Sequence, residues 1–388
     1  MKNVQKLYAS LLDKTKPHAE ELTPSLLKNL VLVGCLILVK ETVNLNKLKN
    51  HVGILLGNTQ TQADSNYRRL TRFFHLPIAQ RKLWKWLISW IIAYVSNWDG
   101  RSMSVYLTLD ATSWKFGAVN IQLLVLSLVY RNVSLPLYWV NLAKKGHSSQ
   151  QQRKRVLQQA MLLFPLKGMC LLADREYVGK DWFKFLQDSG LQFIIRLTKH
   201  DYKHDISRGR RRYDSMLRSA LRGKLCGQDF DLEGQSYQFV ALRNEGDPRG
   251  NDALVLLISN TRWTRRQIGD RYRIRWLTEC LFKHLKSNGF ELEELGMTSL
   301  PKIRLLVAIV VVLYVLCVGE GFRQFHRIRG KYAHDPEQEF KARESVFRRG
   351  YSVVSAQLTT IEHFVDWLSS RLGCQLRVYR RLVFFKPT

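Results

Sequence analysis

Three acidic residues stand at positions from which carboxylates could perform chemistry. Asp110 closes the β-type stretch SVYLTLD, Asp174 closes CLLAD, and Glu279 lies in the charged segment YRIRWLTECLFKHLKSNGFELEEL. An aspartate after a strand also caps helices and turns, so neither aspartate alone identifies a site. Three carboxylates from separate elements, however, suit a pair of hard divalent cations, because Mg²⁺ takes oxygen ligands and relies on substrate phosphate for the rest. Two such ions can activate a water or a 3′-hydroxyl and stabilise a leaving oxygen.

The segment 272–295 is predicted to form one helix that sorts its charges. At about 100° per residue, Arg275, Glu279, Lys283 and Lys286 fall on one side. The opposite side carries the apolar residues Ile274, Leu277, Leu281 and Leu285. One interpretation is a solvated amphipathic helix with a Glu279–Lys283 pair. The other is a carboxylate set in a cationic stripe that holds phosphates.

The composition favours a polyanionic partner. The chain has 388 residues, with 61 Lys and Arg against 32 Asp and Glu, a formal charge of +29. Its pI is near 10.1. A hydrophobic share of 46% argues against a disordered basic tail. DNA or RNA is the commonest neutralising partner of such a chain, and a merely basic protein or one that docks on anionic lipid are the alternatives.

Cysteine, histidine and hydropathy patterns predict a reduced, cytoplasmic protein. The six cysteines form no CxxC pair, and the ten histidines form no HExxH motif, so neither a disulfide frame nor a zinc site is expected. The longest apolar run, Leu305–Val318, has 14 residues. Because about 20 residues are needed to cross a bilayer, this run predicts a buried core helix and no membrane partner. The opening segment lacks the apolar block of a signal peptide.

Residues 1–98 are predicted to form a helical domain that binds DNA. Thr23 and Pro24 mark a helix start. A second helix, in TQADSNYRRLTRFFHLP, carries three arginines suited to DNA phosphates: Arg68, Arg69 and Arg72. A third helix is expected in RKLWKWLISWIIAYV. An ordinary amphipathic bundle with a basic rim is the alternative.

Residues 99–335 are predicted to form the domain that positions the acidic residues, and residues 336–388 a helical C-terminal region for dimerisation or DNA contact. Strands rich in β-formers are expected at 104–110, 119–130, 133–140, 170–174, 191–197 and 253–260. Helices are expected at 149–163 and 181–190. Residues from about 200 to 252 alternate and turn like short antiparallel strands, which predicts an inserted β-rich subdomain. The sum is an α/β fold with a mixed sheet flanked by helices.

These motifs resemble those of a known family. Tyr272, Arg275, Glu279 and Lys286 match Y-(2)-R-(3)-E-(6)-K, the signature of the IS-four family of bacterial cut-and-paste transposases. The block ADREYVGKDWFKFL is similar to the second-aspartate region of that family. Asp110, Asp174 and Glu279 then resemble the DDE triad of RNase H-like transposases, and the stretch before Glu279 resembles the family's insertion subdomain. The resemblance covers roughly residues 60–325.

The resemblance implies a function and further roles. A transposase of this kind binds terminal inverted repeats of an insertion sequence, cleaves DNA with two Mg²⁺ ions, for which Mn²⁺ can substitute, and joins the 3′-hydroxyl to target DNA. Asp110, Asp174 and Glu279 would be the catalytic metal ligands. The expected DNA contacts are Tyr272, Arg275, Trp276, Lys283 and Lys286 together with the three N-terminal arginines.

Relatives act on double-stranded DNA in a synaptic complex, which implies that this chain forms a homodimer there. The expected location is the bacterial cytoplasm, at the nucleoid. Some relatives cut through a DNA hairpin, helped by base flipping onto aromatic side chains. Trp276 could serve there, whereas Trp263 is expected to pack. Two alternatives stay open: a catalytically inactive DNA-binding protein of transposase ancestry, and a general RNase H-like nuclease.

Overall fold

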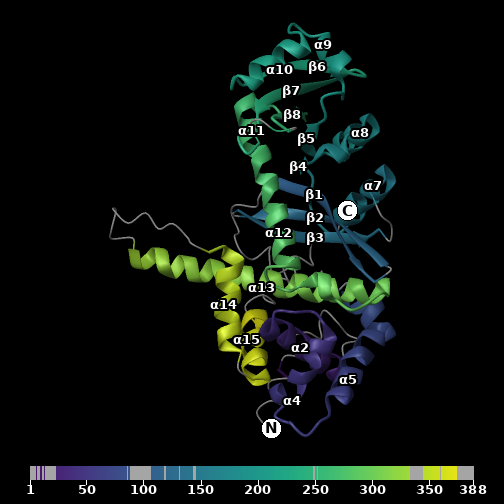
Figure 1. Cartoon of the computed structure of the whole chain (residues 1–388), viewed down its shortest axis with the longest axis vertical. Coiled ribbons are helices and arrows are strands. Elements are labelled where there is room, and N and C mark those ends of the chain that lie inside the picture. The colour runs from purple at the N-terminus through teal and green to yellow at the C-terminus, as the bar shows by residue number, and fades with distance from the viewer. Residues whose placement is uncertain are drawn as a thin grey trace. The chain divides into compact units, whose positions relative to one another are not determined.

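The chain divides into two compact units in a computed structural model (Figure 1). The first comprises residues 1–102, 114–121 and 282–388, and the second comprises residues 103–113 and 122–281. The structure describes residues 23–84, 86–87, 106–117, 119–130, 132–142, 146–247, 250, 252–332, 344–358 and 360–373, and also residues 6, 9, 10 and 13. The predicted division at residues 98 and 335 into functional domains stays a prediction.

An eight-stranded mixed sheet has the order β3-β2-β1-β4-β5-β8-β7-β6, which Figure 1 shows as a ladder of labelled strands. The strands are β1 (Tyr106–Phe116), β2 (Val119–Tyr130), β3 (Val133–Asn141), β4 (Cys170–Ala173), β5 (Gln192–Leu197), β6 (Cys226–Leu232), β7 (Gln235–Arg243) and β8 (Leu254–Ser259). β4 pairs in parallel with both β1 and β5, whereas β8 is antiparallel to β5 and β7. The predicted mixed α/β sheet flanked by helices is confirmed.

The central strands are buried on both faces because helices cover them. The helices of this part are α7 (Gln150–Met161), α8 (Lys180–Asp188), α9 (Lys203–Ser207), α10 (Tyr213–Leu221) and α11 (Arg265–Tyr272). A core cluster joins strands β4, β5, β7 and β8 to α11 through Cys170, Leu172, Ile194, Val240, Leu257, Ile268 and Tyr272. Runs without polar alternation, such as LVLLIS, suit this doubly covered position.

The segment 200–252 differs from the prediction in two respects. Its basic first half is helical, forming α9 and α10, and its second half forms the hairpin β6–β7. This hairpin pairs with β8 and so extends the main sheet, where the prediction was a β-rich subdomain inserted into it. The alternating pattern fixes a hairpin, but it carries no information on which strand the hairpin joins.

The other unit is mainly helical. Its helices are α2 (Pro24–Lys40), α3 (Leu45–Leu48), α4 (Val52–Leu55), α5 (Ala63–His75), α13 (Leu300–Tyr332), α14 (Val346–Gln357) and α15 (Ile361–Gly373). Thr23 caps α2 and Pro24 occupies its first turn, as predicted. The third predicted N-terminal helix begins with a π-helical turn, Ala79–Leu83, and otherwise lies largely outside the described residues.

The apolar run that was predicted to be a core helix lies in α13. Within the described part of the chain, one stretch, Leu300–Phe325, is long and apolar enough to cross a membrane, with a mean hydropathy of 2.6. However, 89% of its most apolar window is buried inside the protein. α13 packs closely along α14, and Gly350 lies against the backbone of α13 at this crossing. The prediction of a buried core helix is confirmed.

The segment 272–295 is not the single helix that was predicted. α11 ends at Tyr272, a 3₁₀ turn covers Arg273–Arg275, and α12 runs from Trp276 to Lys286. Ser287, Asn288 and Gly289 then end the helix, and both Ser287 and Asn288 donate backbone hydrogen bonds to the carbonyl of Lys283. The tighter 3₁₀ turn redirects the chain between the two helices.

Candidate active site

The sheet register brings Asp110 and Asp174 together. In the parallel pair β1–β4, Leu109 lies opposite Ala173, the last residue of β4. Asp110 follows Leu109 and Asp174 follows Ala173, so the two aspartates lie side by side where the pairing of β1 with β4 ends. Asp110 does not end its strand as predicted, because β1 continues to Phe116 beyond the end of its β4 partner. The edge where parallel strands end is where α/β sheets commonly hold their active residues.

Arg275 joins the first aspartate to the predicted glutamate. Its Nη1 lies 2.9 Å from Oδ2 of Asp110, and its Nη2 lies 2.5 Å from Oε1 of Glu279. The Arg275 and Asp110 side chains are 14% and 18% exposed, whereas Glu279 is 38% exposed. One partly buried guanidinium therefore neutralises two of the three predicted acids. Glu279 therefore pairs with an arginine that stands one turn earlier in the chain.

Buried hydroxyls fix the glutamate-bearing helix on the sheet. Thr278, which precedes Glu279, donates a 2.6 Å hydrogen bond to the hydroxyl of Thr108 on β1. Ser134 on β3 lies 3.4 Å from the same Thr278 oxygen. All three side chains are buried. Because Thr108 stands two residues before Asp110, this network holds the two carboxylates at a set distance.

Tyr272 supports the second aspartate. Its ring is 8% exposed and belongs to the core cluster, and its hydroxyl donates to Oδ1 of Asp174 over 3.5 Å. Burial raises the pKa of this phenol, so the hydroxyl keeps its proton and acts as a donor. In this structure Tyr272 touches a carboxylate, and that contact was not part of its expected DNA role.

A fourth carboxylate, Glu176, belongs to the same group. It lies in the 3₁₀ turn that follows Asp174, and its Oε2 is 2.8 Å from Nδ1 of His147. Its other oxygen is buried and has no hydrogen-bond partner among the described residues. The sequence contained this residue in the quoted ADREYVG block, yet nothing in its spacing separated it from an ordinary turn residue.

The electrostatics of Asp110 reflect this crowding. Burial raises the pKa of Asp110 against the opposing charge of Arg275, and with the negative charges of Asp174 and Glu176 adding to the rise the pKa reaches about 6. Like charges that share a partly buried site disfavour one another's ionisation. The group therefore favours a cation, and Arg275 supplies one positive charge.

The types of these side chains match the ligands of a hard divalent cation. Their positions among the described residues do not place them around one shared ion. Carboxylate oxygens from β1, from the end of β4 and from α12 are the ligands that Mg²⁺ prefers. The orphaned buried oxygen of Glu176 adds an acceptor beside them. Across the part of the chain that the structure describes, no three His, Cys, Asp or Glu side chains are grouped to share one metal ion. Arg275 lies between Asp110 and Glu279, so its guanidinium would have to move for them to do so.

The other predicted residues of the 272–295 segment take different positions. Trp276 is 61% exposed at the start of α12, so its indole is available to a partner. Lys283 is exposed. Lys286 pairs with Glu293 at 3.1 Å and lies 5.7 Å from the ring centre of Trp114. Trp263 packs, as expected, against the guanidinium of Arg271 at 3.9 Å.

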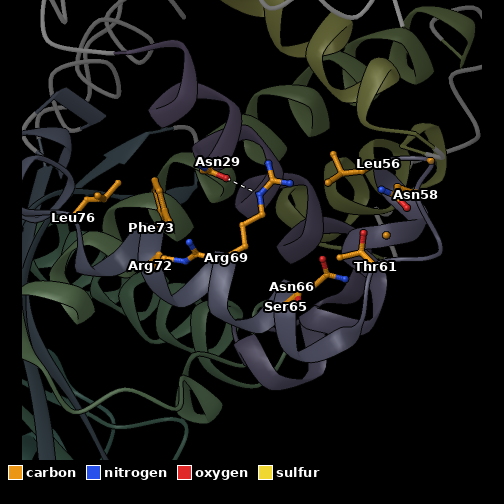
Figure 2. A pocket seen from close by; sticks show the side chains of 12 residues that line it. Asn29, Leu56, Asn58, Thr61, Ser65, Asn66, Arg69, Arg72, Phe73 and Leu76 are labelled. Atoms are coloured by element: carbon orange, nitrogen blue, oxygen red, sulfur yellow. Dashed lines mark hydrogen bonds between the residues drawn. The ribbon is translucent and has the colours of Figure 1, made fainter.

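The three N-terminal arginines lie on α5 but do not share one environment. Arg69 is half-buried, and its Nε donates to Oδ1 of Asn29 over 3.0 Å, as Figure 2 shows. Arg72 lines the same pocket as Arg69, and its Nε donates to the carbonyl of Arg68 over 3.2 Å. Arg68 itself is exposed outside the pocket. Their roles toward DNA stay predictions.

The described cysteines are free thiols, and most of them are buried. Cys35, Cys170, Cys226 and Cys317 are buried and free, and Cys280 is half-buried and free. Burial raises the pKa of Cys35 and of Cys170 to about 12, so these thiols stay protonated and inert.

Comparison with known proteins gives the family of this chain. Residues 94–316, more than half of the 388, match the family model described as "Transposase DDE domain", and the chain therefore belongs to the DDE transposase family. Among solved structures, the chain is similar to the piggyBac transposase in a cryo-EM structure of its synaptic complex with hairpin DNA. The two are 11% identical with a TM-score of 0.44, and the likeness covers 90% of this chain and 76% of that one. No curated protein matches the chain.

Proposed function

We propose that the chain is a cut-and-paste transposase of the IS-four type. It would bind the terminal inverted repeats of an insertion sequence as a homodimer, cleave double-stranded DNA and join the 3′-hydroxyl to target DNA. The observation that carries the proposal is the set of links between Asp110 and three other acids: strand register places it beside Asp174, Arg275 joins it to Glu279, and the charge of Glu176 acts on it. A protein that only binds DNA does not need buried carboxylates next to phosphates.

In this proposal Asp110, Asp174 and Glu279 would hold two divalent ions, with Mg²⁺ the expected metal. Such ions, when bound, polarise the phosphodiester and activate the attacking water or 3′-hydroxyl. Arg275 exchanges its carboxylate partners for phosphate oxygens, for which its planar fork is suited. Tyr272 keeps Asp174 oriented, and Thr278 keeps α12 on the sheet.

Three side chains on α12 would then meet the DNA. Lys283 and Lys286 contribute positive charge toward phosphates, and the exposed indole of Trp276 offers a face for an unpaired base. Because cations displaced from DNA are released on binding, the affinity of the full chain for DNA should fall steeply as salt rises. A flat salt response would contradict the phosphate contacts.

The test is Asp110→Asn in a nicking assay on DNA that carries the inverted repeats flanking the gene. This change removes one metal-binding charge with almost no change in shape, so metal-dependent nicking should be lost while end binding is retained. Asp214→Asn is the matched control, because Asp214 is exposed and pairs only with Lys203 at 3.0 Å. Normal nicking by Asp110→Asn would overturn the metal-ligand assignment. Equal cleavage of random duplex by the parent chain would instead indicate a general nuclease.

A further inference from the structure

The N-terminal helical region contains a pocket that the proposed strand chemistry does not use. Its volume is about 730 Å³, and it lies between α2, α5 and the turn that follows α4 (Figure 2). Its described lining residues are Asn29, Gly53, Leu56, Gly57, Asn58, Thr61, Ser65, Asn66, Arg69, Arg72, Phe73 and Leu76. Pockets of about 300–1,000 Å³ are typical of small-molecule and cofactor sites, so this one is larger than a bare phosphate requires.

One face of α5 forms the wall of this pocket. Asn66, Arg69 and Arg72 of α5 and its C-cap Leu76 recur three or four residues apart, which places them on one side of the helix. The residues that follow α4 form the facing wall. The spacing thus directs polar and cationic side chains of α5 into a concave space.

Several of these polar groups have hydrogen-bonding capacity that the described protein atoms do not satisfy. Asn66 is only 5% exposed, lines the pocket, and its side-chain amide has no hydrogen-bond partner in the described part of the chain. Arg69 is fixed through Nε by Asn29, and among the described residues its two terminal nitrogens have no acceptor. The Asn66 amide is open to the pocket, so a ligand or water there can complete its hydrogen bonds.

The charge of the pocket selects an anion. Arg69 and Arg72 both line it, and none of its described lining residues is acidic. The planar guanidinium fork matches phosphate oxygens in a bidentate manner. An amide such as that of Asn66 both donates and accepts, which suits the edge of a nucleic-acid base. Leu56, Leu76 and Phe73 add apolar surface for the faces of a ring.

We propose that this pocket binds one phosphate-bearing nucleotide, with Arg69 and Arg72 on the phosphate and Asn66 on the base edge. The nucleotide belongs either to a DNA strand, where it is turned out of the base stack, or to the free mononucleotide pool. The first source rests on the proposed function, and the second does not. In both cases the chemistry recognised is a phosphate next to a base.

The experiment uses calorimetric titration of the full chain, without divalent metal, with dAMP and separately with inorganic phosphate. A labelled 20-nucleotide single strand and its duplex are then titrated by fluorescence anisotropy. Asn66→Ala removes the amide and leaves the charge unchanged, and Arg69→Ala removes one pocket charge. Each should weaken nucleotide binding about tenfold, as expected for lost hydrogen bonds to a charged or buried group. Lys40→Ala removes an exposed positive charge from the neighbouring helix α2, outside the pocket, and it should weaken dAMP binding by less than about twofold.

The outcomes separate the alternatives. Tight binding of dAMP supports a free nucleotide. Binding of the single strand but not of dAMP, with the same sensitivity to Asn66→Ala, supports a strand nucleotide. Equal losses for Lys40→Ala and Arg69→Ala with no effect of Asn66→Ala would overturn the proposal, as would phosphate binding as tight as that of either probe. If Asn66→Ala unfolds the helix by circular dichroism, the isosteric Asn66→Asp replaces it, and it should repel the phosphate.

These binding measurements are independent of the cleavage test. A failed pocket test leaves the loss of nicking in Asp110→Asn unaffected, and normal nicking by Asp110→Asn would leave the pocket result unaffected.

Discussion

Replacing Arg275 by alanine tests the central feature of the candidate site, namely that this guanidinium occupies the place where the acidic side chains would hold a cation. The residue is 14% exposed and pairs with Asp110, which is 18% exposed, at 2.9 Å. Removing one partner of a buried pair leaves an unpaired charge and typically costs about 3–5 kcal/mol. Glu279 is 38% exposed, so solvent screens it and it adds little.

We therefore expect Arg275→Ala to lower the free energy of unfolding by roughly 3 kcal/mol without divalent metal. In a domain of this size that corresponds to a fall in Tm of about 5–10 °C. Adding Ca²⁺ or Mg²⁺ should restore much of this loss, because the carboxylates no longer have an internal cation. The parent chain should respond less, since metal there must compete with Arg275.

The assay is thermal unfolding followed by circular dichroism across a series of Ca²⁺ concentrations, with no DNA present. Arg273→Ala is the matched control, because Arg273 stands two residues away, is 58% exposed and pairs with Glu245 at 3.4 Å. It should cost less than about 1 kcal/mol and leave the metal response unchanged. If Arg275→Ala gains no more stability from metal than Arg273→Ala does, the carboxylates do not form a cation site.

Three further predictions concern stability. Thr278→Val removes the hydroxyl that bonds Thr108, so it should cost about 1–3 kcal/mol in urea unfolding while end binding persists. Burial lowers the pKa of His284 from 6.5 to about 4, so the unfolded chain takes up a proton first as the pH falls. The free energy of unfolding should therefore decrease by at most about 3 kcal/mol between about pH 6.5 and 4. His284→Leu should flatten this decrease in a pH series of melting curves. Gly350→Ala would place a Cβ against the backbone of α13, so it should lower the free energy of unfolding by about 3 kcal/mol or more. Gly34→Ala is the control, because its Cβ would lie 3.5 Å from the nearest atom. It should be neutral or stabilising in thermal unfolding.

Local patterns predicted most of the sheet because its strands are runs of β-formers closed by turn residues. The predicted ranges 119–130 and 133–140 fall on β2 and β3 almost residue for residue. The pairing of the strands could not be predicted from these local patterns, because it joins segments that are far apart in sequence. Nothing in the sequence specified that Leu109 would lie opposite Ala173, although this register places the two aspartates together.

The charged segment shows the limit of periodicity more clearly. Helical phase correctly predicted that Arg275 and Glu279 share a face, and they do pair. It could not predict the 3₁₀ turn before α12, because that turn depends on how α11 packs on β5 and β7. It also could not predict that Arg275 would reach back to Asp110, 165 positions earlier in the chain.

The acidic group is an exception to the charge balance of this protein, and that contrast explains the position of Arg275. A chain with a formal charge of +29 has many cations available for exposed acids, yet Asp174 and Glu176 lie close enough to Asp110 that burial and their charges together raise its pKa to about 6. Grouping them disfavours their ionisation, so the arrangement is stable only with a positive charge held among them. Arg275 provides that charge from the 3₁₀ turn before α12, and in doing so it ties Glu279 to β1. A phosphate brought by DNA would compete with these acids for the same guanidinium, so binding of the polyanion and release of the carboxylates toward metal would be coupled through one side chain.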